Sequence, residues 1–134
     1  MARLGMIEGI VESYEGKLKE AGIKSTEALL EACSAKKGRA ELAGKSGISE
    51  NLILKWANRA DLMRIKGVGR EYSNLLEAAG VDTVPELAKR NVENLYKKMV
   101  EVNEEKKLVR ALPLEKQVEG WKEQAVNLPR MLNY

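Results

Sequence analysis

Two stretches of the chain, fifty-eight residues apart, carry the same order of glycine, aliphatic and aromatic residues. The first opens with Ile7-Glu8-Gly9-Ile10 and the second with Ile65-Lys66-Gly67-Val68. The match continues without a gap, pairing Tyr14 with Tyr72, Leu18 with Leu76, Ala21-Gly22-Ile23 with Ala79-Gly80-Val81, Ser25 with Thr83, and Leu29 with Leu87. Self-similarity kept in register over this length indicates a repeated structural unit. We therefore expect two repeats, residues 1–60 and residues 61–134.

Each copy has the apolar spacing of helices. In the second copy the positions i, i+3, i+4 and i+7 are all apolar or aromatic, namely Tyr72, Leu75, Leu76 and Ala79. Gly80 favours the end of this helix, and Thr83 with Glu86 three residues later predicts a capping box that starts the next one. Aliphatic residues that form helices well must fill the interior, and proline is rare. We therefore expect an all-α fold of two four-helix units.

Further helices follow in the first copy. We expect them over residues 39–45 and 50–59, separated by a glycine-containing turn, with Ser49 as the N-cap of the second. Asp61 is expected to cap a short helix over residues 62–65.

In the second copy, a long helix is expected to run to Leu112, where Pro113 breaks it. Trp121 belongs to the last helix. Trp56 and Trp121 share helical spacing with aliphatic residues, so we expect both indoles to lie in the core rather than to form stacking platforms. Cys33 shares a helix face with leucines and is expected to be a small buried apolar residue.

The segment Ile65-Lys66-Gly67-Val68-Gly69-Arg70 has the layout of a helix-hairpin-helix element, in which two glycines flank one aliphatic residue before an amphipathic helix. Glycine allows a positive φ and a close approach of another group. The free N–H groups of such a turn, with those of the helix that it opens, form a concavity that accepts anions. We therefore predict phosphate contacts from Arg64, Lys66, Gly67, Val68, Gly69 and Arg70.

A second basic segment, Lys36-Lys37-Gly38-Arg39, is expected to be an exposed turn. Lys36, Lys37 and Arg39 are further candidates for phosphate contacts, with a solvated loop as the alternative.

The first hairpin departs from this chemistry. Glu8 and Glu12 stand where the second copy has Lys66 and Arg70, and Val11 stands in the position of the second glycine. Carboxylates repel phosphate. The first hairpin is therefore expected to be structural or to face a protein.

Composition excludes several classes of active site. The sequence has no histidine and a single cysteine, so one chain cannot form a Cys/His zinc site or a Ser-His-Asp triad. The carboxylates are scattered, without a pair placed for acid–base chemistry. We therefore expect no enzymatic activity, no cofactor and no metal. No apolar run approaches the length of a membrane span and no leader precedes the chain, so we expect a cytoplasmic protein without membrane contact.

Each half resembles the amino-terminal helix-hairpin-helix domain of RecA-like recombinases, the first over Ile7-Glu8-Gly9-Ile10, Lys17-Leu18-Lys19-Glu20-Ala21-Gly22-Ile23, Thr26-Glu27-Ala28-Leu29 and Gly47-Ile48-Ser49-Glu50. The whole chain resembles a family of helix-hairpin-helix-containing domains of unknown function, most clearly over residues 56–69 and at Leu128-Pro129-Arg130. This resemblance implies one compact body of the SAM-like, paired helix-hairpin-helix type. It also implies binding of duplex DNA through the minor groove and phosphates, without reading of sequence.

Two functions remain open at this point. The leading hypothesis is a non-enzymatic module that binds duplex DNA weakly and without sequence preference, through the amides of the Gly67 to Gly69 hairpin. The alternative is a SAM-like protein–protein adaptor, with self-association as one of its forms. Its basis is the acidic first hairpin and a net charge of only +3.

Overall fold

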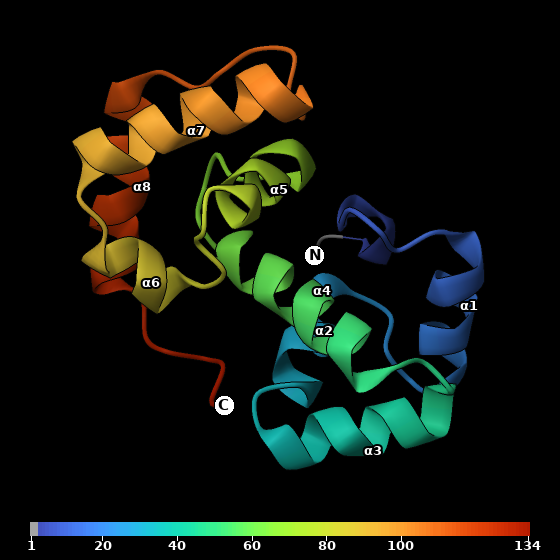
Figure 1. Cartoon of the computed structure of the whole chain (residues 1–134). Coiled ribbons are helices and arrows are strands. Elements are labelled where there is room, and N and C mark those ends of the chain that lie inside the picture. The colour runs from blue at the N-terminus through green and yellow to red at the C-terminus, as the bar shows by residue number, and fades with distance from the viewer. Residues whose placement is uncertain (1–2) are drawn as a thin grey trace. The chain divides into compact units, whose positions relative to one another are not determined.

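A computed structural model describes residues 3–134 of the chain, and every element of regular structure in this range is helical (Figure 1). The prediction of an all-α fold is therefore confirmed. The elements are a short 3-10 helix η1 (Leu4–Met6) and the α-helices α1 (Glu12–Glu20), α2 (Thr26–Ala32), α3 (Lys36–Ser46), α4 (Glu50–Leu62), α5 (Arg70–Ala78), α6 (Val84–Lys89), α7 (Val92–Lys106) and α8 (Glu115–Asn127).

Contacts between residues divide the chain into two compact units. The second unit is Leu62–Arg130, and the first ends at Asp61 but also contains Met131–Tyr134. The Asn133 amide donates to the Ser34 carbonyl at 2.8 Å. The repeat pattern does not predict that residues 131–134 belong with the first unit, because the whole of the second unit separates them from it.

The expected short helix capped by Asp61 is wrong. Helix α4 runs through Asp61 to Leu62, and residues 63–65 form a turn. No glycine or proline interrupts residues 50–62, so nothing stops the helix before the second unit begins. The Asp61 side chain is fully buried in its last turn.

The same backbone hydrogen bonds occur in both units at a spacing of fifty-eight residues. Helices α1 and α5 have nine residues each and begin at corresponding positions. Both end in a Schellman motif, in which a glycine with positive φ follows the helix and the next amide bonds back to a carbonyl five residues earlier. The pairs are Gly22 (φ +93°) and Gly80 (φ +96°), and Ile23 N–H to Leu18 O (2.8 Å) and Val81 N–H to Leu76 O (2.9 Å).

Leucine, isoleucine and a tryptophan form the interior of both units, and valine adds to the interior of the second. In the second unit α8 packs against α6 and α7, and α7 packs against α5 (Figure 1). In the first unit α3 contacts both α1 and α2. Helix α1 buries only Leu18, whereas α5 buries Ser73, Leu75 and Leu76. This difference follows from Lys17, which occupies the position of Leu75.

The expected helix caps are confirmed at two positions and differ at a third. Ser25 Oγ accepts from the Ala28 amide at 3.1 Å, and Ser49 Oγ accepts from the Leu52 amide at 3.2 Å. The expected capping box of α6 does not form in full. Thr83 is the N-cap, but no backbone amide donates to its side chain. Glu86 instead accepts from the Asp82 amide at 3.2 Å and from the Thr83 hydroxyl at 3.4 Å.

Helix α7 is shorter than expected. It ends at Lys106, because Lys107 adopts the left-handed conformation (φ +51°). The Asn103 side chain holds the chain beyond this point, accepting from the Val109 amide at 2.9 Å and donating to the Val109 carbonyl at 3.2 Å. Asparagine competes with helical hydrogen bonding in this way, so the helix stops well before Pro113.

Two glycines of α3 provide a matched test of packing. A Cβ at Gly38 would overlap the Ala32 carbonyl oxygen, whereas a Cβ at Gly44 would meet no atom within 4 Å. Gly38→Ala forces backbone atoms apart and should destabilise the protein by about 1–3 kcal/mol. Gly44→Ala should instead stabilise it by about 0.5–1 kcal/mol, since alanine restricts the unfolded chain. Urea unfolding followed by circular dichroism measures both, and equal effects of the two substitutions would contradict the close approach at Gly38.

The single thiol gives a second test. Cys33 is fully buried, as expected, and burial raises its pKa to about 11, although the Arg39 charge acts in the opposite direction. The unfolded thiol ionises near pH 9, so the unfolded state loses this proton first. The contribution of the protonated thiol to the free energy of unfolding is therefore complete below about pH 9. It is lost as the pH rises from about 9 to about 11, which lowers the free energy of unfolding by about 2 kcal/mol. Comparing the pH dependence of unfolding for the parent and Cys33→Ala isolates this contribution, and parallel curves would refute it.

Candidate nucleic-acid interface

The second hairpin, residues 65–69, joins the end of α4 to the start of α5. Its aliphatic residues point inward, since Ile65 and Val68 are buried while Lys66 and Gly67 are exposed. The Val68 amide donates to the Ile65 carbonyl at 3.1 Å and so closes the turn. Gly67 has a φ of +95°, a conformation in which side chains are strained. The two buried side chains, Ile65 and Val68, therefore anchor the backbone of the hairpin at the surface.

Trp121 supports the hairpin from inside the second unit. A Cβ at Gly67 would lie 3.0 Å from the Trp121 Nε1 atom. Tyr72 packs on the same indole, with ring centroids 5.3 Å apart and planes tilted by 46°. Trp121 is 3% exposed, which confirms it as a core residue and excludes it as an open stacking platform. Glycine is thus required at position 67 by both its φ and the indole beneath it.

Gln124 fixes the hairpin backbone from the side. Its Oε1 accepts from the Lys66 amide at 2.9 Å and its Nε2 donates to the Lys66 carbonyl at 3.2 Å. Arg64 adds another tie, because its guanidinium donates to the Pro129 carbonyl at 2.7 Å. The sequence did not point to Gln124, although it lies three residues, or nearly one helical turn, after Trp121 on α8. The hairpin is therefore held in one conformation before any ligand arrives.

These contacts change the set of amides that could bind phosphate. The Val68 amide, one of the predicted donors, already donates to the Ile65 carbonyl within the turn, so our proposal does not rely on it. The amides of Gly67 and Gly69 have no acceptor among the described residues. The first amides of α5 also lack helical partners, as at every helix start. The donors that remain are the two glycine amides and the first turn of α5.

The cations predicted for the second hairpin differ in exposure. Lys66 and Arg70 are exposed, whereas Arg64 is half-buried and donates to a backbone carbonyl. Arg64 therefore positions the hairpin, and Lys66 with Arg70 supplies most of its positive surface.

The basic segment of residues 36–39 is not the exposed turn that the sequence predicts. It is the first turn of α3. Arg39 is buried, its Nη1 donates to the Cys33 carbonyl at 2.9 Å and to the Asn133 carbonyl at 3.0 Å, and its guanidinium lies 5.6 Å from the Tyr134 ring centroid. Arg39 is thus a structural residue that holds Asn133 and Tyr134. The phosphate contact predicted at Arg39 stays a prediction.

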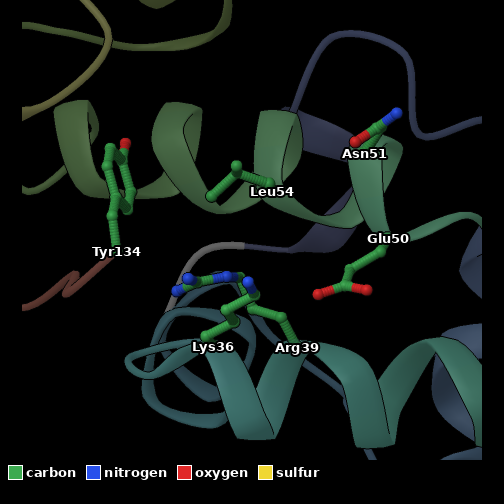
Figure 2. Close-up of a pocket in the computed structure, with 6 residues that line it drawn as sticks. All are labelled: Lys36, Arg39, Glu50, Asn51, Leu54 and Tyr134. Atoms are coloured by element: carbon green, nitrogen blue, oxygen red, sulfur yellow. The ribbon is translucent and has the colours of Figure 1, made fainter.

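Lys36 remains exposed, but its surroundings carry mixed charge. A hollow of about 460 Å³ in the first unit lies between α3 and α4. Figure 2 shows the Glu50 carboxylate beside the same hollow as the side chains of Lys36 and Arg39. A carboxylate there lowers the positive potential that a phosphate needs. The hollow is lined by Lys36, Arg39, Glu50, Asn51, Leu54 and Tyr134.

The first hairpin, residues 7–11, has the same backbone and different side chains. Gly9 has a φ of +97°, and its Cβ position lies 3.2 Å from the Nε1 atom of Trp56, which in turn packs on Tyr14 with centroids 5.1 Å apart. Arg59, three residues after Trp56, donates to the Glu8 carbonyl just as Gln124 donates to Lys66. The first hairpin is therefore built by the same contacts, but it carries Glu8, which is half-buried, and Glu12, which is exposed, in place of Lys66 and Arg70.

Substituting alanine for Gly67 and, separately, for Gly69 distinguishes a glycine that the fold requires from one that it does not. Gly67→Ala must adopt a positive φ and displace Trp121, so it should destabilise the second unit by about 1–3 kcal/mol. Gly69 has a negative φ (−109°) and open space at its Cβ position, so Gly69→Ala should change stability by less than about 0.5 kcal/mol. Thermal unfolding measures both. A Gly67→Ala protein as stable as Gly69→Ala would show that the indole does not constrain this turn.

Within residues 3–134, no three carboxylate or thiol side chains cluster so that they could hold a metal ion. None of the described helices has both the length and the apolar character needed to span a bilayer.

Comparison with known proteins places the chain in a family. The model of a family described as "Domain of unknown function (DUF4332)" matches residues 8–128. No curated protein and no solved structure matches the chain significantly. The matched range takes in both hairpin glycines and both tryptophans beneath them. The chain therefore belongs to the DUF4332 family of domains of unknown function.

Proposed function

We propose that this chain is a non-enzymatic module that binds the backbone of duplex DNA without sequence preference, through the second hairpin. The observation that carries the proposal is the pairing of open amides at Gly67 and Gly69 with the exposed cations Lys66 and Arg70. Backbone amides at a helix start, next to positive charge, suit a phosphate oxygen.

The proposal treats both hairpins as parts of tandem helix-hairpin-helix elements. Its support is the recurrence of the same turn and the same Schellman motif at a spacing of fifty-eight residues, together with the same glycine–tryptophan contact, although the two tryptophans are sixty-five residues apart. In this arrangement the first copy serves as scaffold, and the second copy carries the anion site.

Rigidity favours binding at this site. The turn bond of Val68, the Gln124 clamp and the Trp121 support fix the donors before phosphate arrives. A preformed site loses little conformational entropy on binding. The open donors of the hairpin are backbone amides, and contacts from backbone amides to phosphate oxygens carry no sequence information. Binding should therefore follow the phosphates rather than the sequence.

The number of cations limits the affinity. Two or three ionic contacts give a slope of log K against log salt of about −2 to −3, and a dissociation constant of about 10⁻⁴ to 10⁻⁶ M. A single chain is therefore a weak binder, and useful occupancy requires a second site on the same assembly.

Charge reversal at the hairpin tests the proposal. The variant Lys66→Glu/Arg70→Glu should weaken binding to a 20-base-pair duplex at least tenfold, because each substitution removes an attraction and adds a repulsion. Fluorescence anisotropy at 50 mM and 200 mM NaCl measures this, and the parent protein should lose about tenfold or more between the two salts. Two duplexes of unrelated sequence should bind alike.

The matched control is Lys97→Glu/Lys98→Glu on α7, which lowers the net charge by the same amount and changes exposed lysines of the same unit. It should retain most of the parent affinity. Equal losses of DNA affinity in the two variants would show that binding depends on net charge and not on the hairpin. No measurable binding by the parent protein would end the proposal.

A further inference from the structure

The two hairpins present opposite charges on the same backbone. The first hairpin carries Glu8 and Glu12, and the second carries Lys66 and Arg70 at the corresponding positions. Both turns have a glycine near φ +95° with an indole behind it. The backbone of the turn is thus repeated, while the side chains at two of its positions carry opposite charges.

Apolar side chains add to the first hairpin surface. Met6 and Val11 are 46% and 57% exposed, and they flank the turn on both sides. Exposed apolar side chains beside charged ones suit a protein partner better than they suit phosphate. Neither these apolar side chains nor the two carboxylates favour the binding of phosphate. The occupant of the first hairpin should therefore be a basic protein surface of matching size.

The second hairpin of another copy meets this description. We propose that the chain self-associates head to tail, with the first hairpin of one copy against the second hairpin of the next. Lys66 and Arg70 of one molecule then face Glu8 and Glu12 of its neighbour. This inference shares the second hairpin with the proposed function, but it does not require DNA binding.

A contact between two different surfaces leaves one of each unoccupied on every dimer. Further copies can add until a ring closes. Exposed ion pairs are individually weak and screened by salt. We therefore expect a dissociation constant on the order of 0.1–1 mM at low salt, and a marked loss of association by 300 mM NaCl.

Neutral variants test the contact by complementation. Glu8→Gln/Glu12→Gln removes the acidic surface and Lys66→Gln/Arg70→Gln removes the basic one. Sedimentation velocity from 20 µM to 2 mM in 25 mM NaCl should show concentration-dependent assembly of the parent protein, and each variant alone should remain monomeric. An equimolar mixture of the two variants retains one native pair of surfaces and should form a 1:1 dimer that grows no further.

Lys97→Gln/Lys98→Gln is the matched control and should assemble as the parent does. The inference is overturned if the parent protein is monomeric at 2 mM, or if the mixture sediments no faster than its components. Duplex binding gives an independent readout, because Glu8→Gln/Glu12→Gln should retain parent affinity for DNA. A parent protein that assembles but ignores DNA removes only the proposed function, and one that binds DNA but stays monomeric removes only this inference.

Discussion

The contact between a hairpin glycine and a buried indole is the constraint on which each unit depends. In both units a tryptophan from a thirteen-residue helix lies behind a glycine of positive φ, and a tyrosine packs on the indole. A side chain at the glycine would be strained by the positive φ and would press on the indole, since its Cβ would lie 3.2 Å (Gly9) or 3.0 Å (Gly67) from Nε1. The turn at the surface and the last helix of the unit are therefore fixed by a single contact, and the residue three positions after the tryptophan secures it.

The elements that recur by sequence could be predicted because local patterns specify them. The helices, their glycine stops and the buried tryptophans follow from apolar spacing and turn chemistry. The misplaced features depend on partners far away in the chain. Arg39 is buried because Asn133 offers it a carbonyl, and Gln124 clamps a residue fifty-eight positions earlier. The predicted end of α7 was wrong because of a local interaction. The Asn103 side chain accepts from the Val109 amide in place of a helical carbonyl, and the spacing of apolar residues does not reveal such a bond.

The candidate site shows a separation between scaffold and surface. Buried aliphatic residues, the indole and the clamp set the backbone of each hairpin, whereas exposed charges set what the hairpin attracts. Two charge positions were enough to reverse the potential without altering the backbone hydrogen bonds of the turn. The Val68 amide shows the limit of the sequence here, because a glycine-rich turn predicts open donors but does not say which of them the turn itself consumes.

The first unit is discontinuous along the chain. Its polypeptide leaves at Asp61 and returns at Met131, and Leu132 and Asn133 then fill places within it. A fragment cut at the apparent repeat boundary would lack a buried leucine and the carbonyl that satisfies Arg39. During synthesis, the first unit must wait for residues 131–134 to emerge before its native contacts are complete, although residues 3–61 are made before the whole of the second unit.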